Sequence, residues 1–262
     1  MADAPLALVT GGCRRLGAAI AAALARDGWA LALHASHATD PEPALAAALA
    51  ETGVEWAGFV ADFADLAAAE ALVGRATERF GRAPRLLVNN ASTFGDDVLA
   101  SVSAASLQTH FAVNCAAPAL LTKTFAAADA VTGRSVVNIL DQRIDHPNGD
   151  QFAYTLSKQA LAGLTRTSAR ALAPHVRVNA VAPGLTLPTD AYAPAQVARL
   201  AAAMPLAALP APDQVAAAVL YLARAEATTG QVIYVDGGAH LDSYARDFIY
   251  LAREEPAVSI PS

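Results

Sequence analysis

Tyr154 and Lys158 have the types and spacing of a pair that transfers protons. They are four residues apart in a stretch with helical character, so both side chains are expected on one helix face. A tyrosine has an ordinary pKa of about 10, and a neighbouring cation favours its ionised form. The spacing alone is common. Lys158 is nevertheless informative, because the chain has only one other lysine, Lys123, and otherwise supplies positive charge as arginine.

Asp141 stands thirteen residues before Tyr154. An ionised carboxylate beside a tyrosine raises the tyrosine pKa and keeps the phenol protonated, which suits a proton donor better than a base. A carboxylate is also a good acceptor for the N–H groups of a heterocycle. Two alternatives stay open: Asp141 caps its own loop, or it pairs with Arg143 and leaves a degenerate site.

A glycine turn follows the first apolar run, in the sequence Thr10-Gly-Gly-Cys-Arg-Arg-Leu-Gly17. Such a turn between a first strand and a helix lets the backbone approach a pyrophosphate, whose charge the helix N-terminus favours. The turn therefore predicts a dinucleotide site, with a tight turn that binds nothing as the alternative.

The end of the second apolar run indicates which dinucleotide is bound. An acid at this point would hold the ribose hydroxyls of NAD, but the chain has His34-Ala35-Ser36-His37. Arg14, in the glycine turn, is expected to reach the same region and to favour a 2′-phosphate. The sequence thus predicts NADPH, against the alternative that both histidines are only solvated loop residues.

The bulk composition narrows the class of protein. The chain has 262 residues, of which 55% are hydrophobic and 16% charged, so it is a globular protein. Its net charge of −6 argues against nucleic acid or an anionic membrane as a partner. The N-terminal stretch lacks a basic region, which favours a cytoplasmic location. Cys13 and Cys115 have no metal-like spacing, and we expect no metal.

Short apolar runs alternate with longer alanine-rich segments of helical spacing. This alternation predicts an α/β fold with a doubly wound, parallel, seven-stranded sheet and helices on both faces, in a single domain over residues 1–262. Residues 183–212 are expected to form a loop with a short helical insert, a candidate lid. The tail, 240–262, is expected to pack across a subunit interface. The expected strands are 6–10, 30–34, 56–60, 85–89, 135–140, 177–182 and 231–235, and the expected helices are 16–27, 42–52, 65–80, 103–128, 151–173 and 213–224.

Six motifs, in their order along the chain, resemble the short-chain dehydrogenase/reductase family, and the match runs from residue 6 to residue 238. The resemblance implies a Rossmann fold, usually a homotetramer, and hydride transfer with Tyr154 as proton donor. The motifs are the Thr10–Gly17 turn, Asn89-Asn90-Ala91-Ser92, Asn114, Tyr154-x-x-x-Lys158, Pro183-Gly184 and Val235-Asp236-Gly237-Gly238.

The resemblance also implies roles for single residues. Lys158 would bind the nicotinamide ribose and lower the tyrosine pKa. Asn114 would order a water in a proton relay, unless it is a satisfied core amide, and Asp62 would contact adenine. Enoyl reductases are disfavoured, because they space tyrosine and lysine more widely. The residues expected to bind the cofactor are Gly11, Arg14, Arg15, Leu16, Gly17, His34, Ser36, His37, Asp62, Phe63, Asn90, Ala91, Ser92, Tyr154, Lys158, Pro183 and Gly184.

Two departures from the usual family pattern resemble its pteridine reductase branch, which includes dihydromonapterin reductases. Arg15 replaces the middle glycine of the turn, and Asp141 replaces the common catalytic serine. Ser92 and Phe94 match positions that hold the pterin in that branch, with the aromatic ring stacked on it. The expected substrate residues are Arg15, Ser92, Phe94, Asp141, Tyr154 and Leu185.

The sequence therefore predicts an NADPH-dependent reductase of a small molecule, a dihydropterin. Two alternatives remain. One is a short-chain reductase of another carbonyl substrate, in which Asp141 only replaces the serine. The other is a cofactor-binding protein without turnover, against which the intact Tyr154, Lys158 and Asn114 argue.

Overall fold

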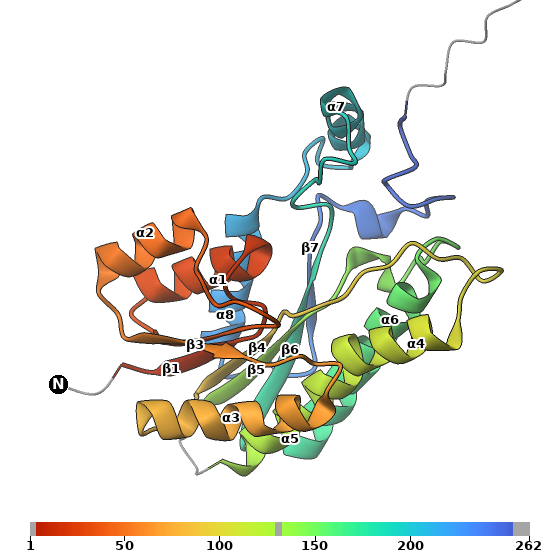
Figure 1. Ribbon diagram of the computed structural model, residues 1–262. Coiled ribbons are helices and arrows are strands. Elements are labelled where there is room, and N and C mark those ends of the chain that lie inside the picture. Colours follow the sequence, from red (N-terminus) through yellow and green to blue (C-terminus); the bar gives the residue numbers. More distant parts are fainter. Residues whose placement is uncertain (1–3, 129–132, 254–262) are drawn as a thin grey trace, which may run out of the picture.

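A parallel sheet of seven strands in the order β3-β2-β1-β4-β5-β6-β7 forms the centre of the computed structural model, which describes residues 4–128 and 133–253 (Figure 1). The expected doubly wound α/β sheet is confirmed, and the strand bounds lie within one residue of those predicted. The strands are β1 (Leu6–Val9), β2 (Ala30–Ala35), β3 (Trp56–Val60), β4 (Leu86–Asn89), β5 (Arg134–Ile139), β6 (Val176–Pro183) and β7 (Val232–Val235).

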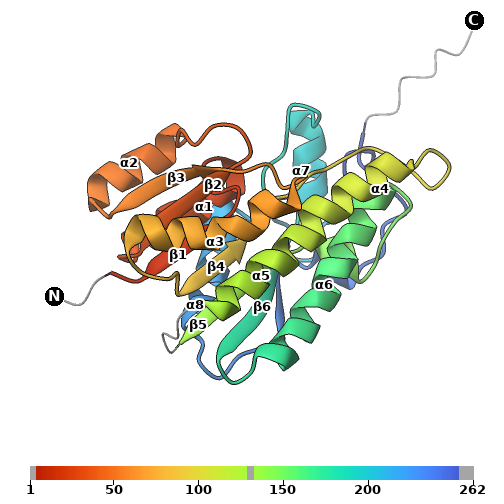
Figure 2. The same cartoon turned by 60° about the horizontal axis from the view of Figure 1, so that its bottom comes forward.

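Helices cover both faces of the sheet, so the central strands are buried and most of their side chains are apolar. Helices α1, α2 and α8 lie on one face, and α3, α4, α5 and α6 lie on the other (Figures 1 and 2). Their bounds are α1 (Arg15–Arg26), α2 (Pro43–Thr52), α3 (Leu66–Phe80), α4 (Ala104–Phe111), α5 (Ala117–Ala127), α6 (Phe152–Leu172) and α8 (Pro212–Arg224). Within the described residues, no helix has the length and apolar character to cross a membrane.

The single helix expected at 103–128 is interrupted. A five-residue π-helix, η1 (Ala112–Ala116), separates α4 from α5. Pro118 in the first turn of α5 has no N–H to donate, so it cannot continue the α-helical pattern of the turn before it. π-turns inside helices occur often at functional sites, and this one carries Asn114.

The chain changes direction at the centre of the sheet, where β1 is flanked by β2 on one side and β4 on the other. In open α/β sheets, ligands bind outside the carboxyl ends of the strands at such a point. Thr10 Oγ1 fastens the two strand ends together by accepting from the backbone N–H groups of Asn90 and Ala91, at 2.9 and 3.0 Å.

The glycine turn after β1 leaves no room for a side chain on α1. A Cβ added to Gly17 would lie 1.9 Å from the Gly11 carbonyl oxygen. We therefore expect Gly17→Ala to lower the free energy of unfolding by about 1–3 kcal/mol in chemical denaturation, because the turn must move. Gly74→Ala, in α3 with no atom near the added carbon, is the control and should be neutral or stabilising. A Gly17→Ala protein as stable as wild type would contradict this packing.

Two late segments lie together over the carboxyl edge of the sheet. Residues 183–212 contain the expected helical insert, α7 (Pro194–Ala203). After β7 and a short 3₁₀ turn, η3 (Ala239–Leu241), residues 242–253 fold back beside α7, and Phe248 joins Leu200 and Met204 in a small apolar cluster. We call residues 242–253 the C-terminal segment. The apolar side chains of this segment pack against the chain's own α7, and the prediction that the tail packs across a subunit interface stays a prediction; residues 254–262 lie outside the described residues.

Candidate active site

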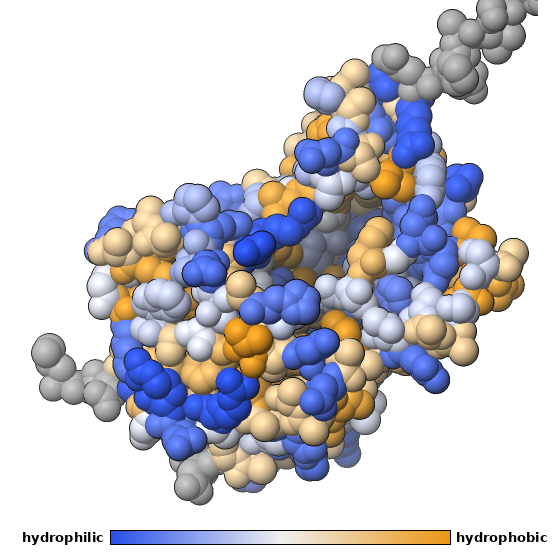
Figure 3. Space-filling model, in the orientation of Figure 1, coloured by the Kyte–Doolittle hydropathy of each residue, from blue (hydrophilic) through white to orange (hydrophobic). Residues whose placement is uncertain are grey.

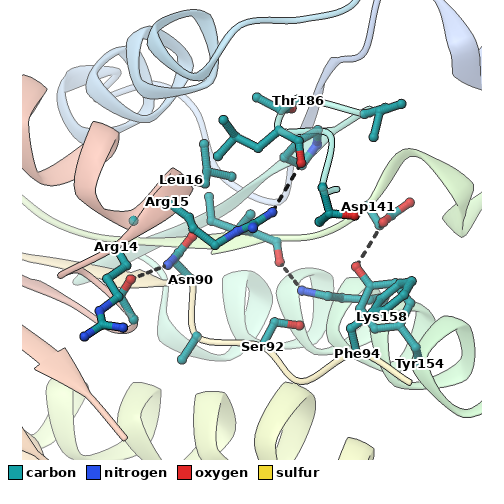
Figure 4. Close-up of a pocket in the computed structure, with 18 of the residues that line it drawn as sticks. Arg14, Arg15, Leu16, Asn90, Ser92, Phe94, Asp141, Tyr154, Lys158 and Thr186 are labelled. Atoms are coloured by element: carbon teal, nitrogen blue, oxygen red, sulfur yellow. Dashed lines mark hydrogen bonds between the residues drawn. The ribbon is translucent and has the colours of Figure 1, made fainter. Parts of the chain in front are cut away.

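A cavity of about 820 Å³ opens at the carboxyl ends of β1, β4, β5 and β6, and the hollow is visible in Figure 3. Most predicted site residues line it, and Figure 4 shows how the central ones face one another. The lining includes Gly11, Arg14, Arg15, Leu16, Gly17, Ser36, His37, Asn90, Ala91, Ser92, Phe94, Asp141, Tyr154, Lys158, Pro183, Gly184 and Leu185. Four predicted residues, His34, Asp62, Phe63 and Asn114, do not line the cavity.

Tyr154 and Asp141 are hydrogen-bonded to each other. The phenol of Tyr154, from the first turn of α6, donates to Asp141 Oδ2 at 2.9 Å. Asp141 follows β5 and caps the 3₁₀ turn η2 (Gln142–Ile144), where its Oδ1 accepts from the backbone N–H and from Nε of Arg143, both at 3.0 Å. The loop cap and the ion pair, which were alternatives to a catalytic role, thus coexist with the bond to the tyrosine.

The environment of this pair favours a charged carboxylate and a neutral phenol. Burial raises the pKa of Asp141, but the Arg143 guanidinium and the hydrogen bonds to the carboxylate outweigh it, so that the pKa lies below its ordinary value. Burial and the Asp141 charge hold the pKa of Tyr154 well above its ordinary value. The phenol therefore keeps its proton at neutral pH, as a proton donor requires.

Lys158 lies near Tyr154, but its hydrogen bond goes to the backbone. Its Nζ donates to the Ile139 carbonyl at 2.9 Å and lies 5.7 Å from the centroid of the Tyr154 ring. Burial lowers the pKa of Lys158 to about 8, although the Asp141 charge opposes this. The pKa of Tyr154 is raised on balance because burial and the Asp141 charge dominate, and a lowering contribution from Lys158 stays a prediction.

Asn114 is a fully bonded core amide. Its amide nitrogen donates to Ser157 Oγ and to the Thr93 carbonyl, and its oxygen accepts from Ser92 Oγ and from the Thr93 N–H. None of these bonds goes to Lys158, so a relay through water stays a prediction. The amide fixes the loop after β4 that carries Ser92 and Phe94 to the cavity.

His34 and Phe63 support the glycine turn from inside the protein. The two rings stack in parallel with centroids 4.1 Å apart. Because the Gly11 N–H donates to His34 Nδ1, the proton lies on Nε2, which donates to the Ala61 carbonyl. Burial lowers the pKa of His34 to about 4. Direct cofactor contact was the wrong role for this pair, since both rings are buried beneath the turn. Asp62 is exposed and accepts from the Ala64 N–H, and its contact with adenine stays a prediction.

Arg15 occupies the position where the family usually has glycine, and its backbone explains that preference. Its φ of 53° lies in the left-handed region, which glycine adopts without strain. The Arg15 backbone N–H is held by Glu42 Oε2 at 2.8 Å, and the guanidinium reaches across the cavity to the Leu187 carbonyl at 3.2 Å. Arg15 thus joins the glycine turn to the loop that precedes α7.

The glycine turn fits the pyrophosphate of a dinucleotide. Arg14, the N-cap residue of α1, makes no side-chain cap bond, and Glu42 accepts only from the Arg15 N–H. Leu16 and Gly17, the next residues of this first turn, line the cavity, where their N–H groups can meet a phosphate. Arg14, Ser36 and His37 are exposed at the same end of the cavity, and no carboxylate ends β2.

Several residues that shape the cavity were not predicted from the sequence. Arg143 was considered only as an alternative partner of Asp141, although its guanidinium lies 6.0 Å from the centroid of the Phe94 ring and 5.3 Å from that of Tyr154. Its position two residues after Asp141 was the feature of the sequence that could have indicated its role. No motif marks the others from the late part of the chain, among them Leu187, Thr189, Tyr192, Asp247, Phe248 and Ile249.

The fold and this site together define an oxidoreductase class. A family model described as enoyl-(acyl carrier protein) reductase matches residues 12–240. Pteridine reductase 1 of Leishmania tarentolae is 34% identical over 284 residues, which cover 91% of this chain and 97% of that protein. The 3-oxoacyl-acyl-carrier-protein reductase of Synechocystis is 31% identical over 241 residues, 90% of this chain and 96% of that protein. The chain belongs to the short-chain dehydrogenase/reductase family.

Two solved structures share both fold and sequence with it. FolM alternative dihydrofolate reductase 1 from Brucella suis, in complex with NADP, superimposes with a TM-score of 0.84 at 39% identity and covers 92% of this chain and 97% of its own. The same protein from Brucella canis, also complexed with NADP, gives a TM-score of 0.85 at 37% identity, covering 97% of both chains. These similarities confirm the resemblance to the pteridine reductase branch.

Proposed function

We propose that this chain is an NADPH-dependent reductase of a dihydropterin. The observation that carries the proposal is the bond between Tyr154 and the charged Asp141 on the wall of a cavity that Arg15 and Phe94 also line. A pterin is flat, has donors and acceptors along its edges, and takes hydride at a C=N bond. The similar proteins described as pteridine reductase and as dihydrofolate reductase act on substrates of this class.

The chain's own residues would bind the substrate and deliver the proton. The Asp141 carboxylate accepts from pterin N–H groups, and Arg15 donates to the acceptor side of the ring. Phe94, a residue that is 56% exposed, offers a stacking face at the cavity wall. Bound NADPH supplies the hydride. Tyr154 gives its proton to N5 as C6 is reduced, and solvent restores that proton.

Lys158 and the glycine turn would hold the cofactor. The buried ammonium of Lys158 faces the cavity beside Tyr154 and can donate to the nicotinamide ribose. The N–H groups at the start of α1 meet the pyrophosphate. A homotetramer, which the family resemblance implies, and a cytoplasmic location stay predictions.

Arg14 is expected to select NADPH over NADH. A charge-assisted hydrogen bond to a 2′-phosphate contributes about 1.5–3 kcal/mol, so Arg14→Ala should raise the KM for NADPH about 10- to 100-fold. The KM for NADH should hardly change, because NADH has no phosphate there. Arg26→Ala is the matched control, since Arg26 is exposed at the far end of α1 from Arg14 and pairs with Glu51 away from the cavity. Equal losses for both cofactors would contradict the assignment.

Isotope transfer tests the proposed reaction. The purified protein would be incubated with 7,8-dihydrobiopterin and with NADPH that carries deuterium on its transferable position. We expect tetrahydrobiopterin with one deuterium at C6, detected by mass spectrometry. Oxidation of NADPH by a β-ketoester, with no label in any pterin, would instead favour the carbonyl reductase alternative, which the similar 3-oxoacyl reductase supports. NADPH binding without oxidation by either substrate would favour a protein without turnover.

A further inference from the structure

Arg143 links the catalytic carboxylate to the C-terminal segment. Its buried guanidinium uses all three nitrogens: Nε donates to Asp141 Oδ1, Nη1 to Gln151 Oε1, and Nη2 to Asp247 Oδ2 at 2.7 Å. The three acceptors come from the end of β5, the start of α6 and the C-terminal segment. A planar guanidinium whose three nitrogens all donate in this way has little freedom to rotate.

The acceptors on the far side of Arg143 are themselves held in place. The Asp247 N–H donates to Asp150 Oδ2 at 2.8 Å, and Asp247 Oδ1 accepts from the Ile249 N–H at 2.9 Å. Gln151 is buried at the start of α6 with a φ of 46°, a conformation that a residue other than glycine adopts at a cost. The Gln151 carbonyl accepts from the Thr155 N–H at 2.9 Å, which holds the backbone where Arg143 needs an acceptor.

The bonds from Arg143 determine which oxygen of Asp141 is available to Tyr154. Arg143 occupies Oδ1 with its backbone N–H and its Nε, which leaves Oδ2 for Tyr154. Without the guanidinium, the carboxylate would be free to rotate about its terminal bond and would lose its nearest cation. Burial would then favour the protonated acid, which no longer accepts hydrogen bonds with both oxygens.

We propose that Arg143 is a positioning residue that keeps Asp141 ionised and turned toward Tyr154, and that Asp247 anchors this guanidinium from the C-terminal segment. The inference rests on the proposed function for the role of Asp141, but it gives roles to two further residues, Arg143 and Asp247. It makes the C-terminal segment part of the active site, although it supplies no proton and no hydride.

All charged and titratable groups around the carboxylate bear on its protonation. Arg143 and Lys158 are the cations, and Asp247 is an anion that shares Arg143 with it. The groups that face this cluster from the packed elements are Asp141 and Arg143 at the end of β5, Tyr154 and Lys158 of α6, Asp150 before α6, Tyr192 before α7, and Asp247.

The first test is the pH dependence of Arg143 variants. Since a cation at this distance lowers a carboxyl pKa by about 1–3 units, Arg143→Met should move the acid limb of the kcat/KM profile for 7,8-dihydrobiopterin upward by about one pH unit or more. Arg143→Lys restores a cation and should return the limb most of the way. A carboxyl ¹³C NMR titration of the unliganded protein, assigned with Asp141→Asn, should show the same movement without turnover.

The second test replaces Asp247, the anion that holds the Arg143 guanidinium from the C-terminal segment. Loss of the Asp247 charge cannot by itself raise the pKa of Asp141, so any upward movement of the acid limb reports a loosened Arg143. We expect Asp247→Asn to lower kcat and to move the acid limb upward by less than Arg143→Met does. Arg246→Met is the matched control. It removes the neighbouring ion pair with Asp150, at 2.8 Å, from the same segment and should leave the acid limb unchanged.

The outcomes separate the two proposals. A wild-type protein that reduces no pterin defeats the proposed function, and the NMR titration then still tests the role of Arg143. The positioning role is contradicted if a folded Arg143→Met protein reduces pterin and neither the acid limb nor the Asp141 titration has moved. An upward movement in Arg246→Met as large as that in Arg143→Met would show a general structural effect and would also overturn it. A wild-type kcat in Asp247→Asn would contradict the anchoring of Arg143 by Asp247.

Discussion

Replacing Asp141 with alanine is expected to abolish dihydropterin reduction while the affinity for NADPH stays nearly unchanged. The substitution removes the acceptor for the pterin N–H groups and the partner of the Tyr154 phenol. A lost hydrogen bond to a charged group and a misplaced proton donor together should lower kcat/KM by about 10³-fold or more. Steady-state kinetics and the quenching of protein fluorescence by NADPH measure the two quantities separately.

Asp141→Asn is the control for this substitution. It keeps the shape of the side chain and one acceptor oxygen, but it removes the charge that pairs with Arg143 at 3.0 Å. We expect it to be as inactive on pterins as the alanine variant, because the amide nitrogen cannot accept a hydrogen bond. Wild-type pterin activity in either folded variant would show that the acid is not part of the reaction.

Tyr154→Phe is expected to lower kcat for pterin reduction by about 10²- to 10⁴-fold, the usual contribution of a general acid. The phenol is the group of α6 that donates to Asp141, whereas the ring packs edge-on against Phe94 with centroids 4.8 Å apart. Phenylalanine keeps that packing, so thermal unfolding should change little. The KM for NADPH should also stay close to wild type.

One outcome would contradict the role of Tyr154 as proton donor. If the phenylalanine variant folds, binds NADPH and reduces dihydropterin at the wild-type rate, another group supplies the proton. A residual rate that rises with the concentration of a small buffer acid would instead support the assignment, because the buffer would replace the missing phenol.

The sheet and the central site residues could be predicted because local patterns specify them. Apolar runs of strand length between alanine-rich helical segments gave all seven strands, and a turn after β1 can be recognised from Gly11 and Gly17 alone. The spacing of Tyr154 and Lys158 places both on one face of α6, and both line the cavity.

The errors arise where packing decides the role of a side chain. The sequence shows that His34 ends β2 but not which way its ring turns, and the ring turns inward onto Phe63. The interruption at η1 depends on a π-turn that periodicity does not reveal. The tyrosine pKa likewise depends on burial, which outweighs the expected effect of Lys158.

The C-terminal segment could not be placed from the sequence at all. Arg143 and Asp247 are 104 positions apart, and no motif connects them. Their pairing follows from the path of the chain after β7, which returns beside α7 and brings Asp247 to the cavity. Such long-range contacts depend on the three-dimensional arrangement of segments that show no common pattern.

The most direct measurement is the oxidation of NADPH by the purified protein with 7,8-dihydropterins, compared with a panel of simple ketones and quinones. A site built around a buried carboxylate should prefer a substrate with N–H donors, so we predict a kcat/KM for the best dihydropterin at least about 100-fold above that for any carbonyl compound. Turnover of carbonyl compounds alone would leave the fold and the Tyr154 chemistry in place, but it would contradict the role given to Asp141, Arg15 and Phe94.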